Sequence, residues 1–341
     1  MRRILRRIVG CALATLPLPA TAQAPAPTPE FYRGREITIL VGYSPGGAYD
    51  VYGRLVARYL GRHLPGRPMV VARNMPGAGG LILAKHLYQA APKDGTVIGI
   101  VARGIAFAPL LQVAGADFDP LAFHWLGSTN EEVSVCAFWH SAGVRDWTQL
   151  KARSYTIGGS GPTSDNEQYP RIMNNVLGTK IKIVTGYPGG NDVVLAMERG
   201  ELDGRCSWSW GSIKSGHPHW LSQRKIDVVM QLGLARHHDL PHVPLVIELA
   251  ETEQDGQVLQ AMFARQTMAW PFVTAPGVPA ERVALLREAF MATTADAELR
   301  AEALGANLEL SPVSGAAIEA LIAKVYAIPD TAKARLRKIL Q

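Results

Sequence analysis

The stretch EITILVGYSPGGAYDVYGRLVARYLGRHL, residues 36–64, decides the fold predicted for this chain. Its first part, Glu36–Tyr43, is rich in β-branched and apolar residues and is typical of a buried strand. Its last part, 50–64, has the period of an amphipathic helix, with one apolar stripe made by Val51, Leu55, Val56, Tyr59 and Leu60. A strand, a glycine-rich turn and a helix in this order begin a βαβ unit.

The same alternation of short strands and helices continues along the chain, and it restarts near 125–138 as a second lobe. Further strands are expected at 68–73, 95–102, 155–159, 181–185 and 226–232. Further helices are expected at 79–91, 280–293 and, as the last helix, 314–326. This order predicts the α/β class, with mixed, mostly parallel sheets and helices on their faces.

The length of 341 residues suits two domains that share one architecture. We predict a first lobe from 32–128 and from a return segment, 256–341, and a second lobe from 129–255. A proline-rich linker, 25–31, precedes the first lobe.

The first 24 residues are typical of a secretory signal peptide. Four arginines precede an apolar run that is too short to cross a membrane, and small residues suited to cleavage follow it. The 35 Lys and Arg against 29 Asp and Glu give a net charge of +6, which falls to +2 without those four arginines. We therefore expect a periplasmic monomer whose basic character belongs mostly to its leader.

The rest of the composition is that of a globular protein, with 48% hydrophobic and 19% charged residues. No run of basic and aromatic residues remains, which argues against a nucleic-acid partner. Cys136 and Cys206 follow the leader. In an oxidising compartment they could form a disulfide or stay as buried thiols, and the sequence leaves both open.

The turn after the first strand is the first candidate binding site. Glycines there let the backbone approach a ligand, and the free N–H groups at the start of a helix favour an anion. Asp50 could cap the helix. The spacing of the glycines satisfies neither the dinucleotide nor the phosphate-loop motif, so no cofactor is expected. A tight turn that merely needs glycine is the alternative.

Similar clusters of small residues follow other strands, at 74–80, 158–164 and 187–190. Thr163 and Ser164 could donate hydrogen bonds to a carboxylate.

These segments, taken in order, resemble the substrate-binding proteins of tripartite tricarboxylate transporters, the TctC or Bug family. The family's P-G-G-x-x-D matches Pro45–Asp50, and its N-x-P-G-A-G-G matches Asn74–Gly80. Its Y-x-G-G and G-x-x-D motifs match Tyr187–Gly190 and Gly200–Asp203, and the resemblance extends over nearly the whole chain after the leader.

The resemblance implies a type II periplasmic binding fold whose two lobes close over a carboxylate in an interlobe cleft. It implies that the carboxylate, an aliphatic di- or tricarboxylate, an aromatic acid or an amino acid, is passed to membrane permease subunits. The ligand-binding positions expected from the matching motifs, with Tyr43 beside them, are Tyr43, Ser44, Pro45, Gly46, Gly47, Ala48, Asp50, Gly161, Thr163, Ser164, Tyr187 and Asp203. Asp203 could instead cap a turn.

Three other residues have two interpretations each. Arg103, after the third strand, could pair with a carboxylate or lie on the surface. Trp208 and Trp210 could stack on an aromatic acid or belong to the core. The segment that holds these two, 204–210, departs from the family pattern and puts the identity of the ligand in doubt.

The sequence argues against an enzyme. No G-x-S-x-G elbow is present, so we expect no catalytic residues. The histidines at 217, 219, 237, 238 and 242 lack the spacing of a helical zinc motif, so we expect no metal. A sensor that presents its ligand to a membrane histidine kinase is the main alternative to transport, and a periplasmic enzyme is the next.

Overall fold

The computed structural model describes residues 28–340. The expected signal peptide, 1–24, therefore lies outside the described residues. So does the first part of the linker, whose last residues form the short helix α1 (Thr28–Phe31). Among residues 28–340 no helix has both the length and the apolar character needed to cross a membrane.

The first lobe is built on a six-stranded sheet in the order β11-β4-β10-β3-β1-β2. Three neighbouring strands, β2, β1 and β3, run parallel, and the remaining pairs are antiparallel. The strands are β1 (Glu36–Val41), β2 (Met69–Asn74), β3 (Val97–Ile100), β4 (His124–Ser128), β10 (Pro271–Thr274) and β11 (Val313–Ser314). β1 begins at the residue expected from the sequence.

The second lobe is built on a five-stranded sheet in the order β7-β6-β8-β5-β9. Here too three strands, β7, β6 and β8, run parallel and the others pair antiparallel. The strands are β5 (Ser134–Trp139), β6 (Tyr155–Gly158), β7 (Ile181–Val184), β8 (Gly204–Ser209) and β9 (Ile226–Leu232). The mixed α/β class is confirmed, but parallel pairing is confined to these three strands in each sheet.

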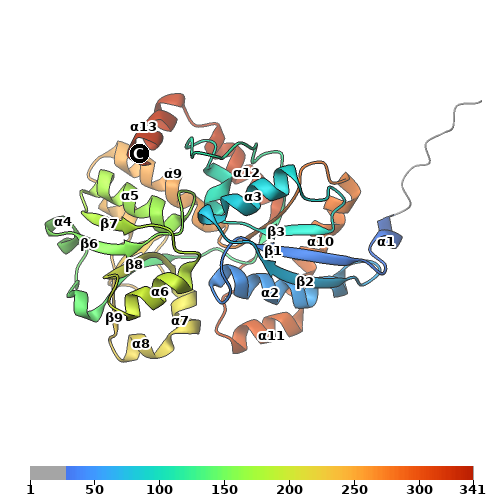
Figure 1. Cartoon of the computed structure of the whole chain (residues 1–341). Coiled ribbons are helices and arrows are strands. Elements are labelled where there is room, and N and C mark those ends of the chain that lie inside the picture. The colour runs from blue at the N-terminus through green and yellow to red at the C-terminus, as the bar shows by residue number, and fades with distance from the viewer. Residues whose placement is uncertain (1–27, 341) are drawn as a thin grey trace, which may run out of the picture.

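Helices cover both faces of each sheet (Figure 1). Around the first sheet lie α2 (Ala48–Leu60), α3 (Leu81–Gln89), α10 (Ala280–Ala295), α11 (Ala297–Gly305) and α12 (Gly315–Tyr326). Around the second lie α4 (Gln149–Ala152), α5 (Asp165–Leu177), α6 (Gly190–Glu198), α7 (Trp210–Gly216), α8 (Pro218–Ser222), α9 (Glu253–Phe263) and α13 (Asp330–Leu340). The helix expected at 50–64 begins two residues earlier and ends at Leu60, where a 3-10 turn follows.

The last helix differs from the expectation. The sequence analysis ended the helices at 326, but α13 follows and packs against α5 of the second sheet (Figure 1). Asn175 of α5 donates to the carbonyl of Ile339 at 2.8 Å. The return segment 256–341 therefore contacts both lobes, because the buried Leu336 and Ile339 of α13 need a second apolar face.

Cys136 and Cys206 form a disulfide between the adjacent strands β5 and β8. This decides the alternative that the sequence left open. Cys136 lies opposite two residues of β8, Cys206 and Ser207, where the register of the pair shifts and Ser207 has a φ of 60°. One residue against two is a β-bulge. The disulfide thus joins the two strands at the bulge.

Candidate ligand-binding site between the two sheets

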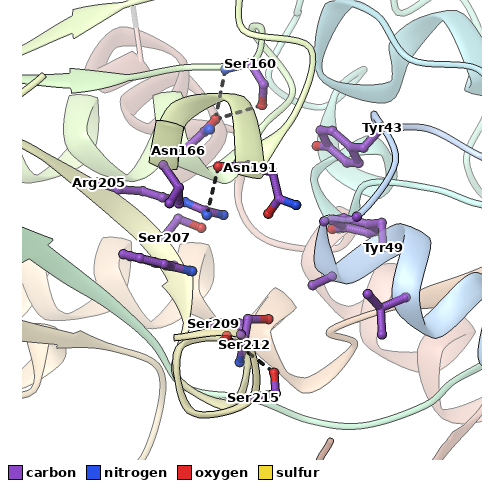
Figure 2. Close-up of a pocket in the computed structure, with 18 of the residues that line it drawn as sticks. Tyr43, Tyr49, Ser160, Asn166, Asn191, Arg205, Ser207, Ser209, Ser212 and Ser215 are labelled. Carbon is purple, nitrogen blue, oxygen red and sulfur yellow. Dashed lines mark hydrogen bonds between the residues drawn. The ribbon is translucent and has the colours of Figure 1, made fainter. Parts of the chain in front are cut away.

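A cavity of about 480 Å³ lies between the lobes. This volume falls in the range of small-molecule sites. Its first-lobe wall includes aromatic side chains and the loop before α2: Tyr43, Gly46, Gly47, Ala48, Tyr49 and Trp270. Its second-lobe wall is mainly polar: Asn166, Asn191, Arg205, Ser207, Ser212 and His217 (Figure 2).

The loop before α2 presents the start of that helix to the cavity. Gly47 is extended and caps α2, and Gly46 has a φ of 81° that favours glycine. The N–H groups of Ala48 and Tyr49 have no acceptor among residues 28–340. Free N–H groups at a helix start carry partial positive charge and suit an anion.

Asp50 shapes this loop and does not line the cavity. It is buried, and its Oδ2 accepts from the N–H of Gly46 at 2.9 Å. Burial by itself would raise the pKa of Asp50, but the hydrogen bonds from Arg54, Gly46 and Asn74 outweigh burial and lower it. The carboxylate therefore stays ionised and holds the turn.

Ser44 and Pro45 also lie outside the cavity lining. The hydroxyl of Ser44 donates to Oδ2 of Asp192 at 2.7 Å, which joins the first-lobe loop to the start of α6 in the second lobe. Pro45 is exposed. The first-lobe loop thus contributes Gly46, Gly47 and Ala48 to the cavity, and Ser44 to the contact between lobes.

The hydroxyls expected in the second lobe are used within the protein. Thr163 Oγ1 lies 3.0 Å from the carbonyl of Ala78 and 2.9 Å from that of Gly79, across the interlobe contact. Ser164 Oγ lies 2.6 Å from the carbonyl of Gly161. Of Gly161, Thr163 and Ser164, only Ser164 lines the cavity.

Asn166, which the sequence analysis missed, offers a donor beside Ser164. Its Oδ1 accepts from both the N–H and the hydroxyl of Ser160 at 3.1 Å. Because a backbone N–H must meet an oxygen, this pairing sets the orientation of the amide. The Nδ2 group has no acceptor among the described residues and remains for a ligand.

Arg205 on β8 is the one arginine in the cavity lining that forms no ion pair with an acid of residues 28–340. Its Nη1 donates to the carbonyl of Gly190 at 3.1 Å, and its guanidinium lies 5.0 Å from the ring centre of Trp208. Its Nε is fully enclosed and has no partner. Burial lowers the pKa of Arg205 to about 10, so it stays protonated at neutral pH.

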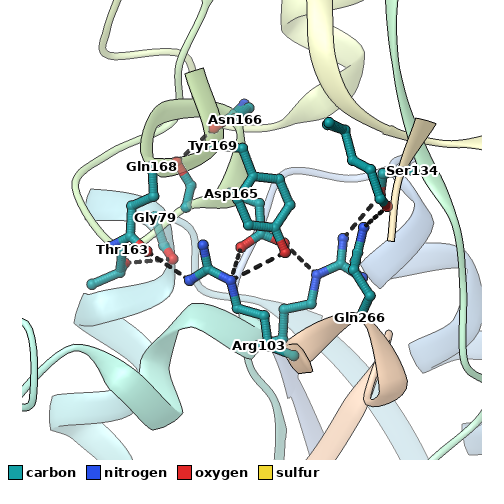
Figure 3. A network of polar contacts seen from close by, with 12 residues as sticks. Gly79, Arg103, Ser134, Thr163, Asp165, Asn166, Gln168, Tyr169 and Gln266 are labelled. Carbon is teal, nitrogen blue, oxygen red and sulfur yellow. Dashed lines mark hydrogen bonds and ion pairs between the residues drawn. The ribbon is translucent and has the colours of Figure 1, made fainter. Parts of the chain in front are cut away.

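Arg103 also lines the cavity, but its charge is balanced. It is buried, so the surface interpretation is wrong, and it pairs with Asp165 and, at 2.7 Å, with Glu132 (Figure 3). Burial would lower the pKa of Arg103, but the two carboxylates outweigh burial and raise it. A ligand carboxylate at Arg103 would have to compete with both acids.

The other second-lobe candidates lie away from the cavity. Oδ2 of Asp203 accepts from the N–H of Thr156 at 2.6 Å and joins the start of β6 to the turn before β8. Tyr187 packs against the core of the second lobe. Trp208 and Trp210 are both buried in that core, and Trp208 also reaches the cavity.

One group among residues 28–340, His237, His238 and Asp239, has ligand atoms close enough for a cation. Asp239 already accepts from Lys214 Nζ at 2.8 Å and from Trp210 Nε1 at 2.9 Å. These two hydrogen bonds lower the pKa of Asp239 to about 2. The ammonium of Lys214 thus already neutralises the carboxylate of Asp239, which is the only acidic side chain of this group.

The two mixed sheets and the cavity between them define the class of protein, a type II periplasmic binding fold. The periplasmic binding protein BugD matches with a TM-score of 0.73 and 18% identity over 90% of this chain and 98% of that chain. MatC from Rhodopseudomonas palustris with bound malate matches with a TM-score of 0.66 and 15% identity, over 90% and 99% of the two chains. A second R. palustris protein, with adipate, matches with a TM-score of 0.67 and 21% identity, over 88% of this chain and 97% of that chain.

Curated proteins are similar to the chain in sequence, although no family model matches it. The UPF0065 protein of the ttuE–ttuC' intergenic region of Agrobacterium vitis is 27% identical over 256 residues, 71% of this chain and 68% of the relative. The UPF0065 protein of the tcbD–tcbE intergenic region of Pseudomonas sp. is 26% identical over 264 residues, 72% and 71% of the two. These relatives and the structural neighbour BugD support the resemblance of the chain to the TctC/Bug family of substrate-binding proteins.

Apart from Ser164 and Trp208, sequence reasoning missed the second-lobe wall. The motifs shared with the family pointed to loops, whereas Arg205, Ser207 and Asn191 lie in or beside segments that the motifs do not cover. The available signal was the departure from the family pattern after Asp203, which places an arginine where the pattern gave no reason for one.

Proposed function

We propose that this protein is a periplasmic solute-binding protein that captures a small carboxylate and delivers it to the permease subunits of a tripartite tricarboxylate-type transporter. The observation that carries the proposal is the interlobe cavity, which both lobes line and which receives donors without a partner from each of them, the N–H groups at the start of α2 and the guanidinium of Arg205. The resemblance to the TctC/Bug family, and the malate and adipate bound by proteins of the same fold, support it.

The electrostatics of the cavity favour an anion. The start of α2 brings unpaired N–H groups from the first lobe, and Arg205 brings a charge from the second. A carboxylate between them is stabilised from both sides.

The contacts between the lobes support a role in capture. Ser44 reaches Asp192, and Thr163 reaches Gly79, on either side of the cavity. A ligand that touches both walls adds to these contacts only while the lobes are together, so it shifts the population toward the closed form.

A thermal-shift screen of the mature protein tests the proposal. Each carboxylate is paired with its neutral amide, and the solution is analysed afterwards for turnover. We expect one carboxylate to raise the melting temperature selectively, because a ligand at 100 times its Kd adds about 2.7 kcal/mol to the free energy of unfolding. If none of the carboxylates raises the melting temperature above its amide, the proposal is wrong.

Delivery needs a separate measurement. The protein is added to vesicles that contain the permease, and uptake of the labelled ligand is followed. Uptake that depends on the binding protein is the expected result, and uptake at the same rate without it would refute delivery.

A further inference from the structure

The cavity holds a positive charge that the described protein does not neutralise. Arg205 is held in place on two sides, by the carbonyl of Gly190 and by the ring of Trp208. Its remaining donors, Nε and Nη2, form no hydrogen bond within residues 28–340. A guanidinium offers such neighbouring donors to the two oxygens of a carboxylate.

The acids near Arg205 are committed elsewhere or exposed. Glu132 pairs with Arg103 at 2.7 Å. Glu198, at the edge of the cavity, is exposed and forms no ion pair among the described residues. Arg205 is half-buried, and keeping a partly desolvated charge without a partner costs stability. A partner that arrives from solution explains the arrangement.

The groups beside Arg205 offer further donors. Asn191 stands between the two walls in Figure 2, and its amide, like the hydroxyl of Ser207, forms no hydrogen bond within the described residues. Asn166 contributes its free Nδ2 from the same wall. A bare hydrocarbon next to the carboxylate would leave these donors unpaired, at a cost to binding.

From these observations, and resting on the proposed function, we infer that Arg205 is the residue that determines ligand specificity. It forms a direct ion pair with the carboxylate, and the ligand carries a hydroxyl or carbonyl oxygen close to that carboxylate, which meets Asn191 and Ser207. This assigns to the second-lobe wall the discrimination between acids.

The first experiment compares Arg205→Gln and Arg205→Lys with the wild type by calorimetry, using the carboxylate that gives the largest thermal shift. We expect Arg205→Gln to weaken binding on the order of 100-fold. Arg205→Lys keeps the charge but loses the paired donors, and its affinity should fall between the other two. Arg199→Gln, which removes an exposed charge from the same lobe, is the matched control and should bind normally.

The stability of the ligand-free variants gives an independent readout. Arg205→Gln removes a half-buried charge that has no partner among the described residues, so its melting temperature without ligand should equal or exceed that of the wild type. A residue with a purely structural role would lower it. An unfolded or strongly destabilised Arg205→Gln variant therefore contradicts the inference.

The second experiment tests the ligand class with named pairs: malate against succinate, lactate against propionate, and gluconate against hexanoate. We expect the hydroxylated acid of at least one pair to bind about tenfold more tightly, and Asn191→Ala to reduce that ratio. If every unsubstituted acid binds as tightly as its hydroxylated partner or more tightly, the ligand does not need a hydroxyl or carbonyl oxygen beside the carboxylate, and that part of the inference is wrong.

The failures are distinguishable. If the wild type binds no carboxylate, the proposed function and this inference fall together. If it binds one and Arg205→Gln binds within about threefold of it, only the role of Arg205 is wrong.

Discussion

His217 lines the cavity with its ring stacked on Trp220, at 4.1 Å between ring centres. Burial lowers the pKa of His217, and the charge of Arg205 lowers it further, although Glu198 acts in the opposite direction. The imidazole is therefore neutral in the folded protein at a pH where the unfolded chain already binds a proton.

The sign of the resulting pH effect follows from linkage. Because the folded pKa lies below the unfolded value of 6.5, the unfolded state gains protons first as the pH falls, and stability is lost below about pH 6.5. We expect the wild type to lose more free energy of unfolding between about pH 7.5 and 5.5 than His217→Gln does. Urea unfolding of both proteins at the two pH values measures the difference, and parallel losses would contradict it.

At the level of single residues, the sequence allowed only a partial prediction of the site. Gly46, Gly47 and Ala48 could be found because a glycine turn between a strand and a helix is a local pattern. The roles of Arg103 and Arg205 could not. Whether an arginine is paired depends on acids that are distant along the chain, and Arg103 meets Glu132 and Asp165 only in the folded molecule.

At the level of elements, the turn after β3 packs closely against the loop before α5. A Cβ placed on Gly104 would lie 2.0 Å from the carbonyl oxygen of Thr163, across the interlobe contact. Neither the backbone of Thr163 nor the buried Arg265 near it is free to yield. A methyl group at this position therefore needs the lobes to separate.

We expect Gly104→Ala to disfavour the closed form and to weaken ligand binding at least about tenfold, because only a fraction of the molecules stays competent to bind. Small-angle scattering should show a larger radius of gyration with ligand present than in the wild type. Gly305→Ala, at the end of α11 with open space around it, is the control. If Gly104→Ala is as compact as the wild type, the backbone around Gly104 and Thr163 can shift to fit the methyl group, and the prediction is wrong.

The bulge in β8 decides which side chains reach the cavity. Strict alternation would put Arg205 and Trp208 on opposite faces of the sheet. The extra residue at Cys206–Ser207 changes the alternation, so that both line the cavity and the guanidinium lies over the indole. The disulfide from Cys136 holds the strands together at this point.

Replacing both cysteines, Cys136→Ala with Cys206→Ala, should lower the free energy of unfolding by about 2–5 kcal/mol, because the bond closes a long loop in the unfolded chain. Urea unfolding of the double variant and of the reduced wild type should give similar midpoints. If the oxidised wild type and the double variant unfold at the same urea concentration, the disulfide does not stabilise the fold.

At the level of the whole molecule, a buried network of charges joins the two lobes and the segments that cross between them (Figure 3). Glu132 lies on the crossover from β4 to β5, and Arg265 on the crossover back to β10. Asp165, at the start of α5, pairs with Arg103 and with Arg265, the latter at 3.1 Å. The two arginines and two acids balance.

Asp165→Asn would leave two buried guanidinium groups with one carboxylate. We expect it to lower the free energy of unfolding by about 3–5 kcal/mol, since removing one partner strands the other charge in the interior. Asp117→Asn, which affects an exposed pair with Lys85 at 3.6 Å, should change little. Equal urea midpoints for the two variants would mean that the network contributes no more than a surface pair.

By itself, the sequence determined the α/β class, most strands of both sheets, the first two helices of the first lobe, and the glycine loop that opens the cavity. These features follow from periodicity and turn chemistry, which operate over a few neighbouring residues. Only the tertiary structure decided that Arg103 is neutralised and Arg205 is not, that Cys136 meets Cys206, and that α13 packs on the second lobe. Each of these depends on which distant segments of the chain meet in the folded molecule. Burial strengthens charge and packing interactions there, so they select one of several arrangements that the local sequence pattern does not distinguish.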